Sequence, residues 1–354
     1  MKILADATLP HVHEWFGDAF QLTLFDSPDE IPKLLAAQDI LLCRSTLNVT
    51  EKLLAKSAIQ CVATASSGSE HLDSSLPKKG ITVFDAKGCN ARAVADYVVA
   101  TLAYLSQHHD IGSLAGIIGC GHVGSDVKSR IQAMGLETLC YDPLKASMDN
   151  SFRSCSPDEL TACSLLCIHA NWHETPPYPS VNLGSKSFLQ RLKPKTIIIN
   201  AARGGIVNEE DVINTGSELI YCTDVYHFEP HINPNIIDVA TICTPHIAGH
   251  SIEAKLAAVE IISQKIHHHY GLPLPIVTQS SPNVELMVSK DFGNSSWQDI
   301  ALQLYNPYQE TLILKKSSDK CHAFLTQRKA HTHRHDFNQY IFTTDEKIQK
   351  ILGK

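Results

Sequence analysis

Short runs of consecutive apolar residues, most of them ending in a polar residue, recur along this chain and limit its fold more than any other feature. Strands that are apolar at consecutive positions are buried on both faces, as in a parallel sheet covered by helices. Segments with helical spacing fill most of the gaps, so the alternation predicts parallel βαβ units in an α/β protein. The runs cover residues 1–6, 39–44, 59–66, 81–86, 114–118, 137–142, 164–169, 196–200, 219–224 and 240–244.

The runs fall into two groups, which predict two doubly wound parallel-sheet lobes. A long apolar helix is expected over 90–107, with Asn90 as its N-cap, where the chain passes from the first lobe to the second. An amphipathic helix over 251–270 is expected to return the chain to the first lobe, and the prolines within 273–283 predict a linker. The expected domains are a first lobe of residues 1–92 and 251–280, an inserted lobe of residues 93–250, and a small C-terminal domain of residues 281–354.

The composition excludes several classes of protein. With 30 basic and 37 acidic residues, the 354-residue chain has a net charge of −7, which gives no electrostatic reason to expect a nucleic-acid partner. No run approaches the roughly 18 apolar residues that cross a bilayer, and the amino terminus lacks a signal-peptide apolar region. Eleven cysteines without a C-x-x-C pair indicate free thiols in a reducing compartment. We therefore expect a cytoplasmic protein with neither a membrane nor a nucleic-acid partner.

A glycine motif of the form G-x-G-x-x-G follows the apolar run at 114–118 and opens a helical segment. In a dinucleotide-binding loop this spacing allows a tight turn, close approach of a pyrophosphate to backbone N–H groups, and close packing of helix on strand. Asp142 ends the next run, where a carboxylate accepts hydrogen bonds from ribose hydroxyls and repels the 2′-phosphate of NADP. The pattern predicts NAD as the cofactor. The loop residues predicted to contact it are Gly119, Gly121, His122, Val123 and Gly124.

Three side chains near later strand ends suit hydride transfer from a secondary alcohol. His246 can accept the hydroxyl proton near neutral pH, and Glu229 can orient its imidazole. Arg203 offers a planar guanidinium for a substrate carboxylate. Because ligands of open α/β sheets bind beyond the carboxyl ends of the strands, all three are expected to face the cofactor crevice.

The motifs G-C-G-H-V-G, N-A-A-R-G-G, D-V-Y-H-F-E-P and P-H-I-A-G, in this order, resemble those of the D-isomer-specific 2-hydroxyacid dehydrogenase family. The segments LCRSTLNVTEKLL, VATASSGSEHLD, KGCNARAVADYV and PHIAGHSIEAK extend the resemblance through the first lobe. It implies a Rossmann-type NAD domain inserted in a flavodoxin-like substrate domain, with a C-terminal dimerisation domain and a homodimeric assembly. It also implies NAD-dependent oxidation of a small phosphorylated 2-hydroxy acid at C2, without a metal.

The resemblance assigns roles to individual residues. Arg203 and Glu229 match active-site positions, and His246 matches the proton acceptor or donor. Ser66 stands where the family usually has threonine, and His250 where it has tyrosine. The further cofactor positions are Asp142, Ala170, Asp224 and Gly249. The candidate substrate-binding residues are Arg44, Ser45, Ser66 and His250; of these, Arg44 is a candidate because its guanidinium suits an anionic substrate.

The tail contains a cluster of basic residues with two alternative interpretations. It supplies a phosphate clamp, to its own or a neighbouring subunit's active site, or it forms a solvated basic face. The cluster comprises Arg328, Lys329, His331, His333, Arg334 and His335.

Two alternatives for the function remain open at the level of sequence. A related dehydrogenase of 3-phosphoglycerate or of a simple 2-hydroxy acid would share every catalytic motif. An NAD-sensing binding protein would also keep Arg203, Glu229 and His246, although the chain lacks long arms for recruiting partners. Turnover distinguishes these alternatives, because a sensor binds NADH without oxidising a hydroxy acid.

Overall fold

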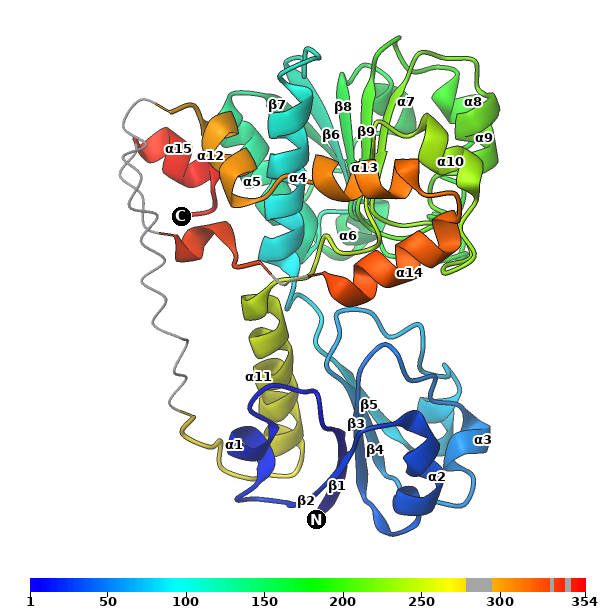
Figure 1. Ribbon diagram of the computed structural model, residues 1–354, viewed down its shortest axis with the longest axis vertical. Coiled ribbons are helices and arrows are strands. Elements are labelled where there is room, and N and C mark those ends of the chain that lie inside the picture. Colours follow the sequence, from blue (N-terminus) through cyan, green and yellow to red (C-terminus); the bar gives the residue numbers. More distant parts are fainter. Residues whose placement is uncertain (278–294, 332–333, 341–344) are drawn as a thin grey trace. The chain divides into compact units, whose positions relative to one another are not determined.

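The computed structural model describes residues 1–277, 295–331, 334–340 and 345–354. The chain divides into two compact units, one of residues 1–90 and 251–284 and the other of residues 91–250 and 285–354 (Figure 1). Each unit is built on its own parallel sheet, which confirms the predicted α/β class with two parallel-sheet lobes. Part of the predicted linker, from residue 278 on, and His333 of the basic cluster lie outside the described residues.

Unit 1 is a five-stranded parallel sheet in the order β2-β1-β3-β4-β5, which is the flavodoxin-like order. Its strands are β1 (Lys2–Asp6), β2 (Gln21–Phe25), β3 (Ile40–Cys43), β4 (Cys61–Thr64) and β5 (Thr82–Asp85). Its helices are α1 (Val12–Phe16), α2 (Ile31–Leu34), α3 (Glu51–Leu54) and α11 (Ile252–His269). The strand β2 was not predicted from sequence, because this edge strand is only partly buried and does not form a fully apolar run.

Unit 2 contains a six-stranded parallel sheet in the order β11-β10-β9-β8-β6-β7. The strands are β6 (Leu114–Ile118), β7 (Glu137–Tyr141), β8 (Leu165–Ile168), β9 (Ile197–Asn200), β10 (Ile220–Thr223) and β11 (Ile242–Cys243). The chain runs from β6 outward to β7 and then back to β8 on the other side of β6. This reversal creates a topological switch point, where open α/β sheets bind their ligands beyond the carboxyl ends of the strands.

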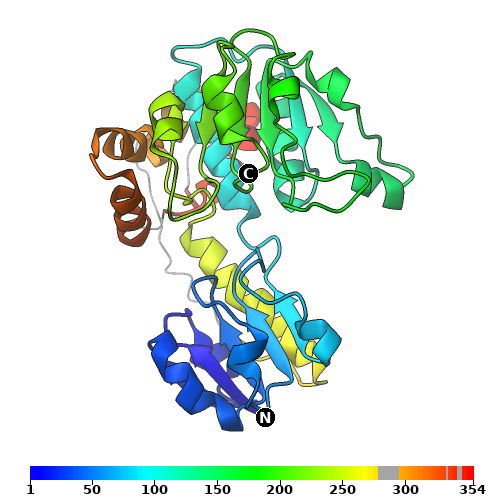
Figure 2. The same cartoon turned by 90° about the vertical axis from the view of Figure 1, so that its right-hand side faces the viewer.

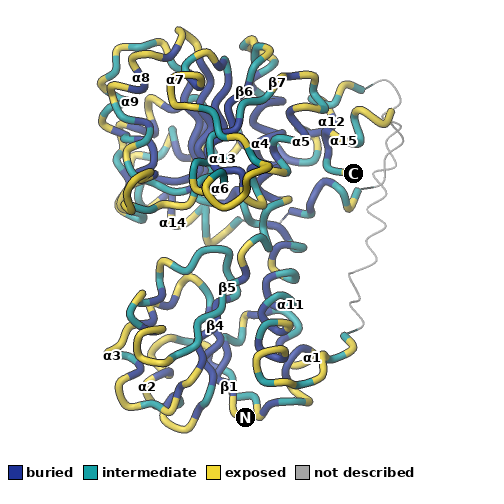
Figure 3. Tube along the Cα trace, turned by 180° about the vertical axis from the view of Figure 1, so that it is seen from behind, coloured by how far each residue is buried: buried dark blue, intermediate teal, exposed yellow. Residues whose placement is uncertain are grey.

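Alternate residues of the unit 2 strands belong to two separate cores, one on each face of the sheet. The helices α4 (Ala91–Leu105), α5 (His122–Met134), α12 (Trp297–Leu304) and α15 (Glu346–Ile351) cover one face. The helices α7 (Pro157–Leu160), α8 (Lys186–Leu189), α9 (Glu209–Asn214), α10 (Pro234–Val239), α13 (Tyr308–Lys316) and α14 (Lys320–Ala330) cover the other. The helix α6 (Pro143–Met148) follows β7. The strands are therefore buried on both faces, as their sequences predict, and they form the dark centre of this unit in Figure 3.

The described tail residues pack on the unit 2 sheet and helices, and the predicted C-terminal dimerisation domain stays a prediction. Thr311 of α13 illustrates this packing. Its hydroxyl accepts a hydrogen bond from Cys243 N at 3.0 Å and donates one to Cys243 O at 2.9 Å, so it satisfies the backbone of the short strand β11. In Figure 2 the tail helices α13 and α14 are orange to brown, beside the sheet, and α15 is red. None of the helices in the described part of the chain is long and apolar enough to span a membrane.

Candidate active site

The glycine loop joins β6 to α5 at the topological switch point. Gly119 has a positive φ of 86°, and a Cβ there would lie 2.5 Å from the backbone of Ala170 after β8. A Cβ on Gly124 would lie 1.9 Å from the carbonyl oxygen of Gly119. A Cβ on Gly121, by contrast, would meet no heavy atom within 4 Å. Protein packing thus requires two of the glycines, and the third keeps the N-terminus of α5 accessible to a pyrophosphate.

Asp142 connects the glycine loop to the end of β7. One of its carboxylate oxygens accepts from Cys120 N at 2.8 Å, and the other caps α6 by accepting from Lys145 N at 3.0 Å. The Lys145 ammonium donates back to Cys120 O at 2.9 Å, a contact that the sequence did not indicate. Because a carboxylate offers about four lone-pair sites, Asp142 retains acceptor capacity for ribose hydroxyls. The residues of this edge therefore fit a dinucleotide.

The loop after β8 forms the other side of the switch point. His169 N donates to Ile118 O at 2.7 Å, which holds the His169–Ala170 segment beside the end of β6. Burial lowers the pKa of His169 to about 3, so its imidazole stays uncharged near neutral pH. The His169–Ala170 segment therefore carries no charge at the switch point near neutral pH.

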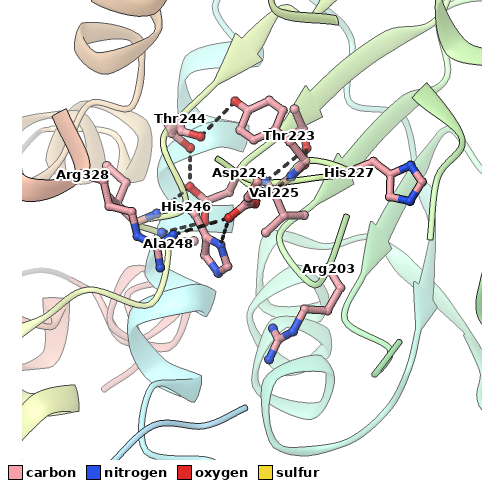
Figure 4. A network of polar contacts seen from close by, with 12 residues as sticks. Arg203, Thr223, Asp224, Val225, His227, Thr244, His246, Ala248 and Arg328 are labelled. Carbon is pink, nitrogen blue, oxygen red and sulfur yellow. Dashed lines mark hydrogen bonds and ion pairs between the residues drawn. The ribbon is translucent and has the colours of Figure 1, made fainter. Parts of the chain in front are cut away.

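His246 and Glu229 form a close pair. The Nδ1 atom of His246 lies 2.7 Å from Oε2 of Glu229, and the other carboxylate oxygen accepts from Tyr226 N at 2.8 Å (Figure 4). Burial raises the pKa of Glu229, but the charge and hydrogen bond of His246, the Tyr226 N–H and Arg328 together bring it below its ordinary value. An ionised carboxylate on Nδ1 fixes the orientation of the imidazole and leaves Nε2 available for a substrate proton.

The backbone of His246 is held in a left-handed conformation, with φ of 56°. Such a conformation is uncommon for a residue with a side chain and persists where the surroundings enforce it. Here Asp224, at the end of β10, holds the residues on both sides of His246 by hydrogen bonds. Its carboxylate accepts from the Thr244 hydroxyl at 2.6 Å, from Ile247 N at 2.8 Å and from Ala248 N at 2.9 Å.

Asp224 is therefore an anchor of the His246 loop in this structure, with only 1% of its surface exposed. Its burial raises the pKa of its carboxyl group above the ordinary value, against the lowering effect of His246 and of its three donors. The resemblance assigned Asp224 to cofactor binding, and that role stays a prediction. Gly249 follows Ala248 in the same loop, and its cofactor contact likewise stays a prediction.

Arg203 follows β9, the strand next to β10 in the sheet, and Figure 4 shows its side chain in the same region as His246. One of its terminal nitrogens donates to Ala202 O at 2.8 Å. A guanidinium carries five N–H donors in a planar fork, a geometry that suits a carboxylate. The structure thus brings Glu229 and His246 into contact and places Arg203 at a neighbouring strand end.

Two arginines of the basic tail cluster approach this site from within unit 2. Arg328 lies 3.4 Å from Oε2 of Glu229. Arg334 is 9% exposed and donates to the carbonyl oxygens of Ala248 at 2.8 Å and His250 at 3.1 Å. Arg334 is therefore part neither of a solvated face nor of a phosphate clamp, since its charge is used inside the fold. Sequence could not reveal these contacts, because they join residues about ninety positions apart.

The predicted substrate residues of unit 1 lie where β3 and β4 end. Arg44 donates to the Thr8 hydroxyl at 2.7 Å, and Ser45 beside it is exposed. The Ser66 hydroxyl donates to Gly68 O at 2.8 Å. Lys255 of α11, which no sequence motif indicated, lies in the same unit, and its pKa is lowered by partial burial and by the charge of Arg44. Arg44 and Lys255 together provide positive potential for an anionic group.

His250, the remaining predicted substrate residue, ends the unit 2 segment that carries His246. Its ring centroid lies 6.0 Å from that of His331, and its carbonyl oxygen accepts a hydrogen bond from Arg334.

A separate cavity of about 360 Å³ lies at the opposite edge of the unit 2 sheet, where Ser164, Thr196 and Ile220 mark the amino ends of three strands. It is not part of this site.

The fold and the site together define an NAD-dependent dehydrogenase that acts on 2-hydroxy acids. The profile described as "D-isomer specific 2-hydroxyacid dehydrogenase, NAD binding domain" matches residues 98–248. The chain is 51% identical to the erythronate-4-phosphate dehydrogenase of Legionella pneumophila over 100% of both chains. It is 33% identical to that of Coxiella burnetii over 90% of this chain and 88% of the relative. This chain belongs to the D-isomer specific 2-hydroxyacid dehydrogenase family.

A solved structure shares the fold at lower sequence identity. The NAD⁺-bound 3-phosphoglycerate dehydrogenase of Entamoeba histolytica superposes with a TM-score of 0.65 and 19% identity, over 78% of this chain and 98% of that one. The fold is thus that of an NAD-binding dehydrogenase, as predicted.

Proposed function

We propose that this protein oxidises 4-phospho-D-erythronate at C2 to 3-hydroxy-2-oxo-4-phosphooxybutanoate, a reaction of pyridoxal 5′-phosphate biosynthesis. The 2.7 Å contact between His246 Nδ1 and Glu229 Oε2, at the carboxyl edge of a dinucleotide-binding sheet, carries the proposal of a dehydrogenase. The names of the relatives that align over the whole length of the chain support this particular substrate.

The proposed mechanism assigns one task to each catalytic side chain. The glycine loop and Asp142 would hold NAD, which would supply the hydride acceptor for C2. His246 accepts the C2 hydroxyl proton at Nε2, because Nδ1 is occupied by Glu229. Glu229 stabilises the imidazolium that forms, and Arg203 binds the substrate carboxylate through paired N–H groups. In the reverse direction His246 returns the proton to the keto oxygen.

The glycine loop and Asp142 bind the dinucleotide. The N-terminus of α5 receives the pyrophosphate, and Asp142 accepts from the ribose hydroxyls. A carboxylate at this position disfavours the 2′-phosphate of NADP. Ala170, Asp224 and Gly249 complete the proposed cofactor residues.

The substrate phosphate requires cationic partners, which unit 1 provides. Arg44 and the adjacent Lys255 are the proposed partners of this group, with Ser45 and Ser66 as hydroxyl donors. Partial burial of Lys255 strengthens its interaction with an anion relative to bulk water. His250 is proposed as a further substrate contact, in place of the tyrosine usual in the family.

The protein is further proposed to act as a homodimer in the cytoplasm. The composition, with its many free cysteines, is typical of a reducing compartment. The tail that the resemblance assigns to dimerisation packs on unit 2 in the described residues, and it leaves Ile313 of α13 and Leu325 of α14 exposed. Light scattering tests this proposal, because a mass of one chain contradicts it.

A substrate panel on the purified protein tests the proposed reaction. Reduced nicotinamide absorbance is followed with 4-phospho-D-erythronate, 3-phosphoglycerate, D-lactate and D-glycerate. We expect kcat/KM for the first acid to exceed the others by at least about tenfold, which is 1.4 kcal/mol of differential transition-state binding. Preference for another acid would overturn the substrate, and binding of NADH without turnover of any acid would overturn the enzymatic function.

A further inference from the structure

Arg328 is a tail residue in contact with the proposed catalytic pair. It lies on α14, and its Nη1 atom approaches Oε2 of Glu229 at 3.4 Å. The same oxygen accepts from His246 Nδ1 at 2.7 Å. One carboxylate oxygen is therefore shared by the imidazole and by a guanidinium that comes from the far end of the chain (Figure 4).

The packing of α14 against the loop after β10 determines the position of Arg328. Phe324, one helical turn before Arg328, is 1% exposed and meets the Tyr226 ring edge-on at a centroid distance of 5.7 Å. Tyr226 N in turn donates to the other oxygen of Glu229. Residues four apart lie on the same face of a helix, so the docking of Phe324 directs Arg328 to the carboxylate.

We propose that Arg328 is a positioning residue that sets the charge balance of the Glu229–His246 pair. This inference rests on the proposed function, because it assigns His246 the role of proton acceptor. Arg328 holds the carboxylate in place and competes with the imidazolium for the negative charge of Oε2. The tail thereby takes part in the chemistry of the site.

The charges around the pair define the direction of this effect. The other titratable groups that influence the pair are Asp224 after β10, Glu209 of α9 and the Tyr226 hydroxyl. None of these three is positively charged, whereas Arg328 is a permanent cation with a third of its side chain exposed. A cation near the imidazole disfavours protonation of that ring.

Removing Arg328 therefore stabilises the protonated form of His246. Substrate oxidation requires the neutral imidazole, so the acid limb of the pH profile of kcat/KM moves to higher pH. For a like charge one side chain away, the expected shift is about 0.5 to 1 pH unit. Removing Glu229 acts in the opposite direction, because the imidazolium then loses its counter-ion.

The test compares four variants in the full chain. R328Q removes the charge, and R328K keeps the charge without the planar fork. K329Q is the matched control, because Lys329 is the exposed neighbour in the sequence and also loses one positive charge. E229Q removes the negative charge beside His246, so it should shift the titration of the ring in the opposite direction. The readouts are the pH profile of kcat/KM, and the midpoint of the His246 ring titration by NMR without substrate, with H246N used for the assignment.

We expect the midpoint of the His246 titration and the acid limb of kcat/KM to move to higher pH in R328Q and by a smaller amount in R328K. Neither should move in K329Q, and both should move to lower pH in E229Q. Equal midpoints in R328Q and the parent protein would overturn the inference. A raised KM for the phosphorylated acid with an unmoved profile would assign Arg328 to substrate binding and also overturn it. The NMR titration needs no turnover, so it gives a result even if the proposed substrate is wrong.

Discussion

Arg334 donates a hydrogen bond of 2.8 Å to the carbonyl oxygen of Ala248, so a residue near the end of the chain holds the loop that carries His246. The same guanidinium binds Ala93 O at 2.7 Å and lies 4.4 Å from the Tyr305 ring. The chain passes between the two units at residues 90–91 and 250–251, and Arg334 contacts the unit 2 side of both passages. Its role is therefore to fix backbone segments that sequence separates by more than 150 residues.

Replacing Arg334 with methionine is expected to destabilise unit 2. The change leaves the carbonyl oxygens of Ala93, Ala248 and His250 without this donor, and each buried unsatisfied group costs about 1–3 kcal/mol. We expect a loss of roughly 3 kcal/mol in the free energy of unfolding, measured by urea denaturation. Arg191→Met is the control, because Arg191 and its partner Asp158 are 49% and 80% exposed, and it should cost less than about 0.5 kcal/mol. Equal losses for the two variants would refute the internal role.

His246→Ala is expected to abolish turnover while NADH binding is retained. Loss of a proton acceptor lowers kcat by roughly 10²–10⁴-fold, whereas the dinucleotide contacts lie on the glycine loop. Steady-state rates and NADH fluorescence titration measure the two effects. The control is His227→Ala, which removes an exposed histidine two residues before Glu229. Normal turnover of the His246 variant would eliminate the proposed mechanism.

Gly121 and Gly124 of the glycine loop are expected to differ in how replacement by alanine changes stability and NADH affinity. A Cβ at Gly121 meets no heavy atom within 4 Å, so G121A should keep its melting temperature but lose NADH affinity by at least about tenfold. A Cβ at Gly124 would lie 1.9 Å from Gly119 O, so G124A should lower the melting temperature. Calorimetry with and without NADH distinguishes the two. Unchanged NADH affinity in G121A would contradict the assigned pyrophosphate position.

Glu209 is expected to make stability depend on pH. Burial raises the pKa of its carboxyl group from 4.5 to about 7, against the effect of the His227 N–H that it accepts at 2.7 Å. Because the folded pKa is raised, the stability associated with the protonated group is fully present below pH 4.5 and is lost as pH rises through 7. We expect Glu209→Gln to gain on the order of 2–3 kcal/mol relative to the parent protein over this window.

The measurement is urea unfolding of both proteins at several pH values between 4 and 8. Glutamine keeps the acceptor for His227 N, so the difference reports the charge alone. A difference in stability that does not change with pH would show that folding does not raise the pKa of Glu209.

The sequence predicted the central strands because their burial on both faces appears as unbroken apolar runs. It missed β2, whose pattern is only partly apolar because one edge of this strand is open. The tail illustrates a second limit. The sequence did not indicate how the tail packs, whereas in the structure Thr311 and Arg334 bind backbone groups of unit 2. Such polar contacts leave no periodic signal, since any serine, threonine or arginine could make them.

By itself, the sequence determined the two parallel-sheet lobes and the NAD loop, because these depend on local apolar runs and on glycine spacing. Its motifs also predicted the residue types of the proposed catalytic groups. The tertiary structure alone decided which groups meet. Glu229 contacts His246 at 2.7 Å, Asp224 accepts a hydrogen bond from the Thr244 hydroxyl, and Arg328 approaches Glu229. Each of these contacts joins residues from different elements of the chain. Their geometry depends on how helices and strands pack, and packing is a property of the whole fold.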